Sequence, residues 1–292
     1  MPTRPLRVAI NGFGRIGRTL LRILLRDARD IDLVLINEIE PLPTCAYLFQ
    51  YHSVFGPCPG DVNAGQGVLT VDGRAIPFHA EPDLRALDLS AVDVVLECTG
   101  MGGARAMAER GLAAGAAAVL VSGPSAEADA TLVLGANEAD LSDQRIISNA
   151  SCTTNALAPL VRSLDDAFGI VSGQMTTVHC YTGSQPTVDK PRSAPERSRA
   201  AALSMVPTTT SAPHQTALAL PHMKARIEAR AIRVPTASAS CLDLTVHTPP
   251  PAPPPALHTL PPPSAASAPA FGSTPQPLVR SALPRPPACV LS

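Results

Sequence analysis

The sequence contains no tryptophan, has only 3% aromatic residues and carries no excess of either charge. Its 23 basic and 24 acidic side chains leave a formal net charge of −1 over 292 residues. Such a chain lacks the positive excess that holds a polyanion, so we expect no nucleic-acid partner. The 45% content of hydrophobic residues argues against a wholly disordered chain, and the length suits about two domains.

Paired cysteines are also absent. The seven cysteines are spread widely and include no C-x-x-C pair. This spacing favours neither a zinc site nor a disulfide framework, so we expect no metal. Reduced thiols fit a reducing compartment.

No long hydrophobic run is present. The longest stretch of low polarity is residues 111–121. It is too short for a transmembrane helix, which needs about 20 apolar residues. Arg4 and Arg7 lead through a short apolar run into a glycine loop, not into a cleavage site. We therefore expect a cytoplasmic protein with no membrane partner.

Proline is concentrated at the end of the chain. Residues 249–292 hold 15 of the 32 prolines, contain no Asp, Glu or Lys, and have only Arg280 and Arg285 for charge. Proline cannot donate to a β-ladder or continue a helix, so we expect this tail to be disordered. The predicted parts are a dinucleotide-binding domain (1–151), an incomplete catalytic domain (152–248) and the Pro-rich tail (249–292).

The first part alternates apolar and helix-like segments. A helix is predicted over residues 18–27, and strands are predicted at 6–11, 32–37, 93–97, 118–121, 131–134 and 145–147. This alternation predicts an α/β fold with a doubly wound parallel sheet. Asp72-Gly73 predicts a small antiparallel hairpin between residues 67–71 and 74–78.

The second part has a different pattern. It predicts a helix over 156–168, a strand over 173–179, a long polar loop over 181–199, and a final strand pair, 229–234 and 241–246. We expect a truncated α+β domain here.

A glycine motif follows the first predicted strand. Residues 12–17, Gly-Phe-Gly-Arg-Ile-Gly, fit G-x-G-x-x-G, in which the glycines permit a tight turn, close approach to a pyrophosphate and close helix packing. Glu38 follows 21 residues after Gly17 and can accept hydrogen bonds from a ribose. Because a carboxylate repels a 2′-phosphate, NAD is favoured over NADP. The alternative is an ordinary glycine turn with a solvated glutamate.

Cys152 lies between a predicted strand and a predicted helix. A helix N-terminus favours the thiolate, although a free cysteine is also commonly a buried structural residue. His179, if close, would favour the thiolate further and could take a proton from a hydroxyl formed by attack on a carbonyl.

Together these residues resemble the phosphorylating glyceraldehyde-3-phosphate dehydrogenases and their relatives, the erythrose-4-phosphate dehydrogenases. The matching segments are residues 9–17 (AINGFGRIG), 98–100 (CTG), 148–155 (SNASCTTN), 176–179 (TTVH) and 233–236 (RVPT).

The resemblance implies oxidation of glyceraldehyde 3-phosphate to 1,3-bisphosphoglycerate, with Cys152 as nucleophile and His179 as base. A thiohemiacetal on Cys152 becomes a thioester, which inorganic phosphate cleaves. The expected partners are a phosphorylated aldehyde, inorganic phosphate and further copies of the chain in a homotetramer.

The same resemblance assigns the binding residues. The cofactor contacts would be Asn11, Gly12, Phe13, Gly14, Arg15, Ile16, Gly17, Glu38, Thr99, Gly100 and Ser122. Thr182, Ser184 and Arg233 match the substrate-phosphate site, and Ser151, Thr153, Thr210 and Ser211 match the attacking-phosphate site. Hydroxyl donors and a guanidinium suit phosphate oxygens.

The resemblance ends near Val246, and relatives continue with further strands and a helix. We expect either a shifted coding frame near residue 248 or a genuine tail, and impaired activity in either case. Two alternatives stay open: an erythrose-4-phosphate dehydrogenase, or an inactive NAD-binding remnant.

Overall fold

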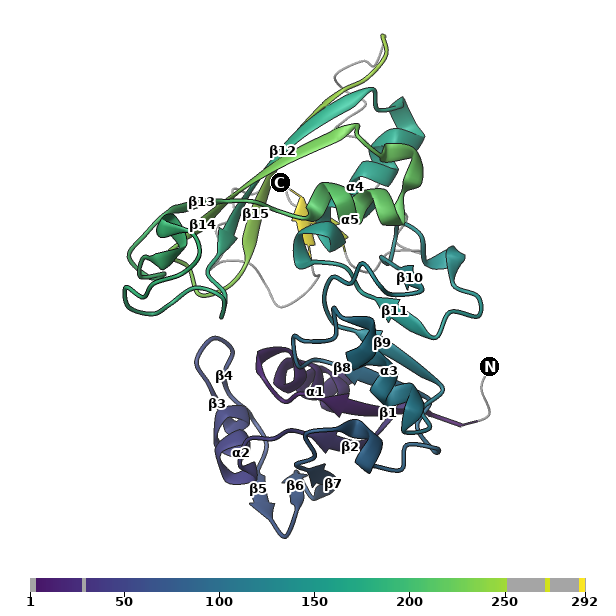
Figure 1. Cartoon of the computed structure of the whole chain (residues 1–292), viewed down its shortest axis with the longest axis vertical. Coiled ribbons are helices and arrows are strands. Elements are labelled where there is room, and N and C mark those ends of the chain that lie inside the picture. The colour runs from purple at the N-terminus through teal and green to yellow at the C-terminus, as the bar shows by residue number, and fades with distance from the viewer. Residues whose placement is uncertain (1–3, 28–29, 251–270, 274–288, 292) are drawn as a thin grey trace. The chain divides into compact units, whose positions relative to one another are not determined.

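The computed structural model describes residues 4–27, 30–250, 271–273 and 289–291. The chain divides into two compact units, coloured in chain order in Figure 1: Met1–Thr131 with Leu141–Ala150, and Leu132–Asp140 with Ser151–Ser292. The predicted first domain was continuous to residue 151, whereas here Leu132–Asp140 groups with the second unit.

A nine-stranded sheet forms the centre of the first unit, in the order β10-β11-β9-β8-β1-β2-β7-β6-β5. Strands from β10 to β7 pair in parallel, and β7, β6 and β5 pair antiparallel. This order confirms the predicted doubly wound sheet. The bounds are β1 (Leu6–Asn11), β2 (Ile31–Asn37), β5 (Val62–Gly65), β6 (Val68–Val71), β7 (Arg74–His79), β8 (Val94–Glu97), β9 (Ala118–Val121), β10 (Ala130–Thr131) and β11 (Ile146–Ser148).

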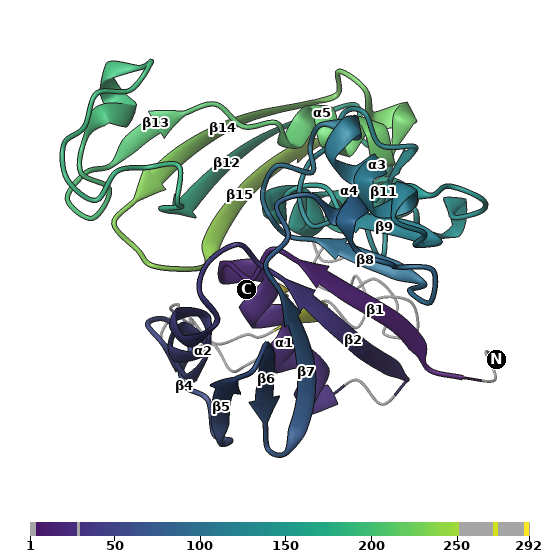
Figure 2. The same cartoon turned by 60° about the horizontal axis from the view of Figure 1, so that its bottom comes forward.

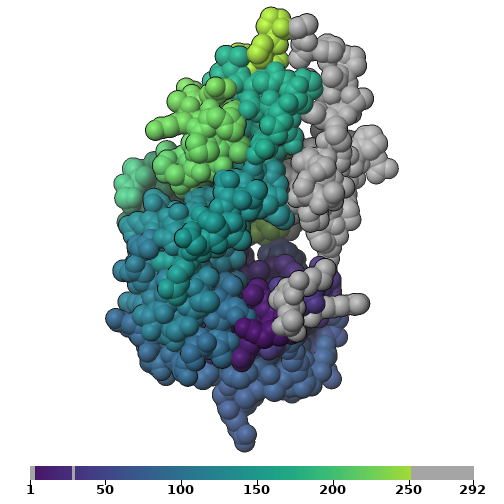
Figure 3. Space-filling model, turned by 90° about the vertical axis from the view of Figure 1, so that its right-hand side faces the viewer, coloured from purple at the N-terminus to yellow at the C-terminus, as the bar shows by residue number. Residues whose placement is uncertain are grey.

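The hairpin of β6 and β7 forms where Asp72-Gly73 predicts it, with positive φ at both turn residues. This hairpin belongs to the main sheet, because β7 also pairs with β2 (Figure 2). The turn between β5 and β6 forms the blue tip at the bottom of the space-filling view (Figure 3). A separate two-stranded pair joins β3 (Tyr51–His52) and β4 (Gly56–Pro57).

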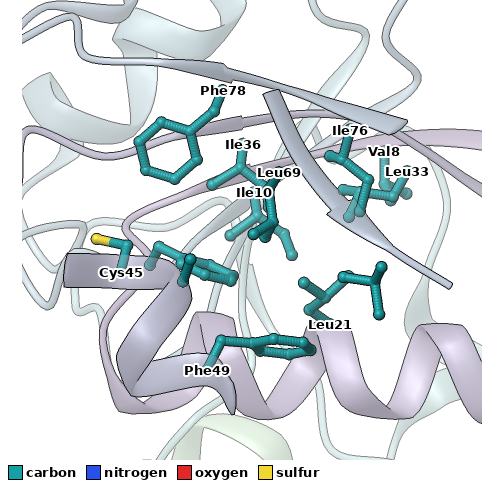
Figure 4. Close-up of a cluster of buried hydrophobic side chains, with 13 residues drawn as sticks. Val8, Ile10, Leu21, Leu33, Ile36, Cys45, Phe49, Leu69, Ile76 and Phe78 are labelled. Atoms are coloured by element: carbon teal, nitrogen blue, oxygen red, sulfur yellow. The ribbon is translucent and has the colours of Figure 1, made fainter. Parts of the chain in front are cut away.

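The core of the first unit lies between the sheet and its helices, α1 (Arg15–Asp27), α2 (Leu42–Gln50) and α3 (Arg105–Ala113). Figure 4 shows Ile10 of β1, Leu21 of α1 and Phe49 of α2 converging, and all three are fully buried. Burial of each such side chain contributes about 1.5–3 kcal/mol. The leucine spacing in residues 18–27 therefore marks the helix that covers β1.

The second unit contains a four-stranded sheet in the order β13-β14-β12-β15. Its strands are β12 (Ser172–Cys180), β13 (Val206–Thr208), β14 (Ile227–Val234) and β15 (Ser240–His247). The helices α4 (Cys152–Phe168) and α5 (Ala212–Ala219) pack together. Short 3-10 helices lie at Leu84–Ala86, Glu138–Asp140, Pro195–Ser198 and Pro221–Met223.

The predicted pairing of residues 229–234 with 241–246 is wrong. These segments are β14 and β15, and β12 lies between them, parallel to β14 and antiparallel to β15. Neighbouring strands are about 4.8 Å apart, so the connection 235–239 is long enough to cross one strand. Local turn length therefore did not decide the pairing.

Two short segments of the tail are described. β16 (Phe271–Ser273) and β17 (Cys289–Leu291) pair in parallel. The rest of the tail predicted to be disordered lies outside the described residues, apart from Pro249 and Pro250. Within the described part of the chain, no helix has the length and apolarity needed to cross a bilayer.

Candidate active site

Cys152 is the first residue of α4. Ser151 is the N-cap, and its hydroxyl accepts a hydrogen bond from Thr154 N at 3.1 Å. Ala150 has a positive φ of 54°, an uncommon conformation for a residue with a Cβ. The strained turn and the cap place the exposed thiol of Cys152 at the positive end of the helix dipole.

His179 supplies the partner that the sequence could only suggest. Its side chain comes from β12 and is 6% exposed. Nε2 lies 3.2 Å from Cys152 Sγ, and Nδ1 lies 2.7 Å from the carbonyl oxygen of Cys180. Held at both nitrogens, the imidazole faces the thiol in a fixed orientation.

The electrostatics of this pair differ from those of the other thiols. The hydrogen bond with His179 is the largest cause that lowers the pKa of Cys152, and the same contact is the first cause that raises the pKa of His179 to about 10. Burial instead raises the pKa of Cys45 to about 11 and of Cys98 to about 12. The geometry therefore favours a thiolate–imidazolium pair at Cys152 alone among these three thiols.

Arg233 approaches the same histidine from β14. The two residues are partners in the parallel pair of β12 and β14. Arg233 Nη1 lies 2.5 Å from His179 Nδ1 and donates to the Cys180 carbonyl oxygen at 2.9 Å. Burial lowers the pKa of Arg233. Two cationic groups so close together favour an anion beside them.

The hydroxyl groups predicted to bind phosphate lie at the starts of two helices and in one loop. Ser151 and Thr153 flank Cys152 at the start of α4, and Thr210 and Ser211 directly precede α5. Thr210 Oγ1 already accepts a hydrogen bond from Ala212 N at 3.1 Å. Thr182 and Ser184 face each other in the loop after β12, with 3.0 Å between their hydroxyl oxygens.

Arg197 is a cation that the sequence analysis missed. Its guanidinium contacts Thr208 Oγ1 and donates to Thr209 Oγ1 at 3.1 Å, next to Thr210. The sequence feature that could have indicated Arg197 is its place in the polar loop 181–199, which already contains the predicted phosphate-binding residues Thr182 and Ser184.

The glycine motif shows where a dinucleotide fits the first unit. Gly12 has φ +92°, and a Cβ there would meet Thr99 N at 2.6 Å; a Cβ at Gly17 would meet the Gly12 carbonyl oxygen at 2.2 Å. Gly14 has open space within 4 Å of such an atom. The loop therefore leaves room for close backbone approach by a phosphate at the start of α1, where Arg15 and Ile16 are exposed.

Glu38 follows β2 and reaches the same loop. Its Oε2 accepts a hydrogen bond from Phe13 N at 2.7 Å, and Oε1 accepts from Glu40 N at 3.2 Å. This arrangement holds a carboxylate beside the glycine turn, where a ribose hydroxyl would need an acceptor. The residues present thus fit a dinucleotide.

The remaining predicted cofactor residues lie at neighbouring strand ends. Asn11 ends β1, Thr99 and Gly100 follow β8, and Ser122 follows β9, where its N–H donates to the Glu97 carbonyl oxygen at 3.0 Å. The side chain of Asn11 is buried and donates to Glu97 Oε2. Glu97 was not singled out from the sequence, although a carboxylate closing the apolar run Val94–Glu97 is an unusual feature.

Comparison with known proteins gives the same assignment for both units. Residues 6–105 match the NAD binding domain of glyceraldehyde 3-phosphate dehydrogenase, and residues 151–253 match its C-terminal domain. Similar curated proteins are glyceraldehyde-3-phosphate dehydrogenases from Xanthobacter flavus (46% identical over 242 residues), Streptomyces coelicolor (42% over 245) and Borreliella burgdorferi (43% over 249). Each match covers 82% of this chain and 72%, 73% and 74% of the relative, respectively. The chain belongs to the glyceraldehyde-3-phosphate dehydrogenase family and is an NAD-dependent oxidoreductase.

Proposed function

We propose that this chain oxidises glyceraldehyde 3-phosphate and phosphorylates the product to 1,3-bisphosphoglycerate. The observation that carries the proposal is the 3.2 Å contact between Cys152 Sγ and His179 Nε2 at the start of α4. A thiolate made available by an imidazolium is the nucleophile that covalent oxidation of an aldehyde requires.

The chemistry follows from the pair. The thiolate of Cys152 attacks the aldehyde carbon, and the carbonyl oxygen takes the proton of His179, giving a thiohemiacetal and a neutral imidazole. His179 then accepts the hydroxyl proton as the carbon loses a hydride, leaving a thioester on Cys152. NAD, when bound, supplies the hydride acceptor. Inorganic phosphate attacks the thioester, and the acyl phosphate forms as the Cys152 thiolate is released.

Two anions must be held for this reaction. Arg233, Thr182 and Ser184 would bind the phosphate of the aldehyde, because Arg233 places an extra cation against His179. Ser151, Thr153, Thr210 and Ser211 would bind inorganic phosphate, with Arg197 beside Thr208 and Thr209 supplying charge.

The cofactor would be held by the first unit. Gly12, Phe13, Gly14, Arg15, Ile16 and Gly17 would surround the pyrophosphate, with Asn11, Glu38, Thr99, Gly100 and Ser122 around them. The carboxylate of Glu38 on the Phe13 amide supports NAD over NADP.

We also propose a cytoplasmic homotetramer with reduced turnover relative to its relatives. The support for reduced turnover is β15, which has one partner strand among the described residues, followed by the tail. Light scattering after size-exclusion chromatography would test the tetramer. A monomer would contradict it.

The direct test is NADH formation by the purified chain with glyceraldehyde 3-phosphate, NAD and inorganic phosphate. Cys152→Ser should lower kcat by about 10³-fold or more, because the alkoxide is far less available than the thiolate. Cys241→Ser, an exposed free thiol on β15, is the matched control and should retain activity. Turnover without phosphate dependence, or only with erythrose 4-phosphate, would contradict the proposal, and no turnover with intact NAD binding would indicate an inactive remnant.

A further inference from the structure

Glu97, the last residue of β8, is 2% exposed. It forms no ion pair with any cation in the described part of the chain. Burial of a carboxylate without a cation is costly, so the groups around it must compensate.

A directional chain of hydrogen bonds leads to Glu97. Asn37 Oδ1 accepts from Glu81 N at 2.9 Å, and Asn37 Nδ2 donates to Glu81 O at 2.9 Å, which fixes the orientation of this amide. Asn37 Nδ2 also donates to Asn11 Oδ1 at 2.9 Å. Asn11 must therefore turn its Nδ2 to Glu97 Oε2, 2.5 Å away.

The other oxygen of Glu97 accepts as well. Thr99 N donates to Oε1 at 2.9 Å. Thr99 Oγ1 accepts from Met101 N at 3.1 Å, so its own hydrogen points to Glu97 Oε1, which it contacts. Both oxygens thus serve as acceptors, and the group that fits is the ionised carboxylate.

This negative charge lies where the strand order of the sheet reverses. Asn11 and Glu97 are register partners at the carboxyl ends of β1 and β8. A dinucleotide would bind across such a switch point; with its adenosine ribose at Glu38 after β2, its nicotinamide half would lie on the β8 side. The oxidised nicotinamide ring is cationic, and the reduced ring is neutral.

We propose that Glu97 is a positioning residue of the cofactor site whose buried charge favours oxidised over reduced cofactor. It holds Asn11 and Thr99 in place through hydrogen bonds, and no cation among the described residues neutralises its charge, so a cationic ring nearby would be favoured over a neutral one. This inference rests on the proposed cofactor site.

Calorimetric titration of the full chain with NAD and with NADH, without aldehyde, tests the proposal. In Glu97→Gln the ratio of Kd for NAD to Kd for NADH should rise about tenfold. Asp129→Asn is the matched control: Asp129 accepts backbone amides of Arg145 and Ile146 in the same unit but is paired with Arg105. Its ratio should stay as in the wild type.

A double variant that exchanges the carboxylate and the amide of Glu97 and Asn11 controls for misfolding. In Glu97→Gln the new amide faces Asn11 Nδ2, which should lower the melting temperature without cofactor. Adding Asn11→Asp restores donor to acceptor at every link and returns a negative charge at the register partner on β1. The double variant should recover the melting temperature, which would show that the loss in Glu97→Gln comes from this one hydrogen bond.

Equal weakening of NAD and NADH in Glu97→Gln, or an unchanged ratio, would overturn the inference. Failure of the proposed function would appear instead as absent turnover in a chain that still binds NAD.

Discussion

Arg233 and His179 lie opposite each other on parallel strands β14 and β12, with Arg233 Nη1 2.5 Å from His179 Nδ1. Both groups point toward the carbonyl oxygen of Cys180. A bound phosphate would relieve this crowding of positive charge by drawing the guanidinium toward itself.

Replacement of Arg233 should therefore act mainly on binding of the phosphorylated aldehyde. A charged hydrogen bond contributes about 1.5–3 kcal/mol, so Arg233→Leu should raise KM for the aldehyde about 10- to 100-fold. Arg230→Leu, exposed on the same strand, should leave KM unchanged. Steady-state kinetics would measure KM for the aldehyde in both variants. Equal changes of KM would contradict a role of Arg233 in binding the substrate phosphate.

The pH dependence of thiol alkylation should report the pair of Cys152 and His179. Since only the thiolate reacts and its pKa is lowered, the iodoacetamide rate should rise at a pH below the ordinary thiol value of about 8.5. His179→Gln should move the midpoint upward. His222→Gln, which removes a 3.1 Å contact between Nε2 and Asp165 Oδ2, is the control and should leave the midpoint in place. An unshifted midpoint in His179→Gln would mean that the helix, not the imidazole, lowers the pKa.

Two glycines of one motif should respond differently to a methyl group. Gly17→Ala places Cβ 2.2 Å from the Gly12 carbonyl oxygen and should destabilise the first unit by about 3 kcal/mol in urea unfolding. Gly14→Ala has no atom within 4 Å of the new Cβ, so stability should change by less than about 0.5 kcal/mol. Calorimetry should nevertheless show weaker NAD binding by Gly14→Ala. Retained affinity would place the pyrophosphate elsewhere.

Glu38 should decide between the two nicotinamide cofactors. Glu38→Gln removes the charge that repels a 2′-phosphate but keeps an oxygen for the Phe13 amide. We expect the ratio of kcat/KM for NADP to that for NAD to rise about tenfold. Glu40→Gln, an exposed neighbour, should leave the ratio unchanged. A similar rise of this ratio in both variants would mean that loss of any nearby negative charge favours NADP, and that Glu38 has no specific role.

Much of the first unit could be predicted because its signals are local. Residues 6–11 and 118–121 form β1 and β9 as expected, and the leucine spacing marks α1. Two of the helices that were not predicted, α2 and α5, have proline in the first turn and resemble loops in sequence. α2 buries Cys45, Ala46 and Phe49, and α5 buries Ala212 and Thr216. The strand expected over 131–134 is only Ala130–Thr131, because Val133 N donates to the Asn137 side chain.

The site could be named but not assembled from the sequence. Cys152 and His179 are 27 residues apart, and their contact depends on the long-range packing that brings the end of β12 to the start of α4. Arg233 meets His179 only through the register of β14 with β12, which the expected pairing of β14 with β15 would not produce. Such long-range pairing is fixed by packing of the whole sheet, not by local pattern.

The position of β12 in its sheet has a consequence for hydrogen exchange. β12 has β14 on one side and β15 on the other, whereas β15 has one partner strand within the described ranges. Amides along the outer edge of β15 should exchange through small local openings, and those of β12 only through openings that disrupt the sheet. Fraying at β15 would therefore leave protected the amides of β12 that pair with β14, on the strand that carries His179.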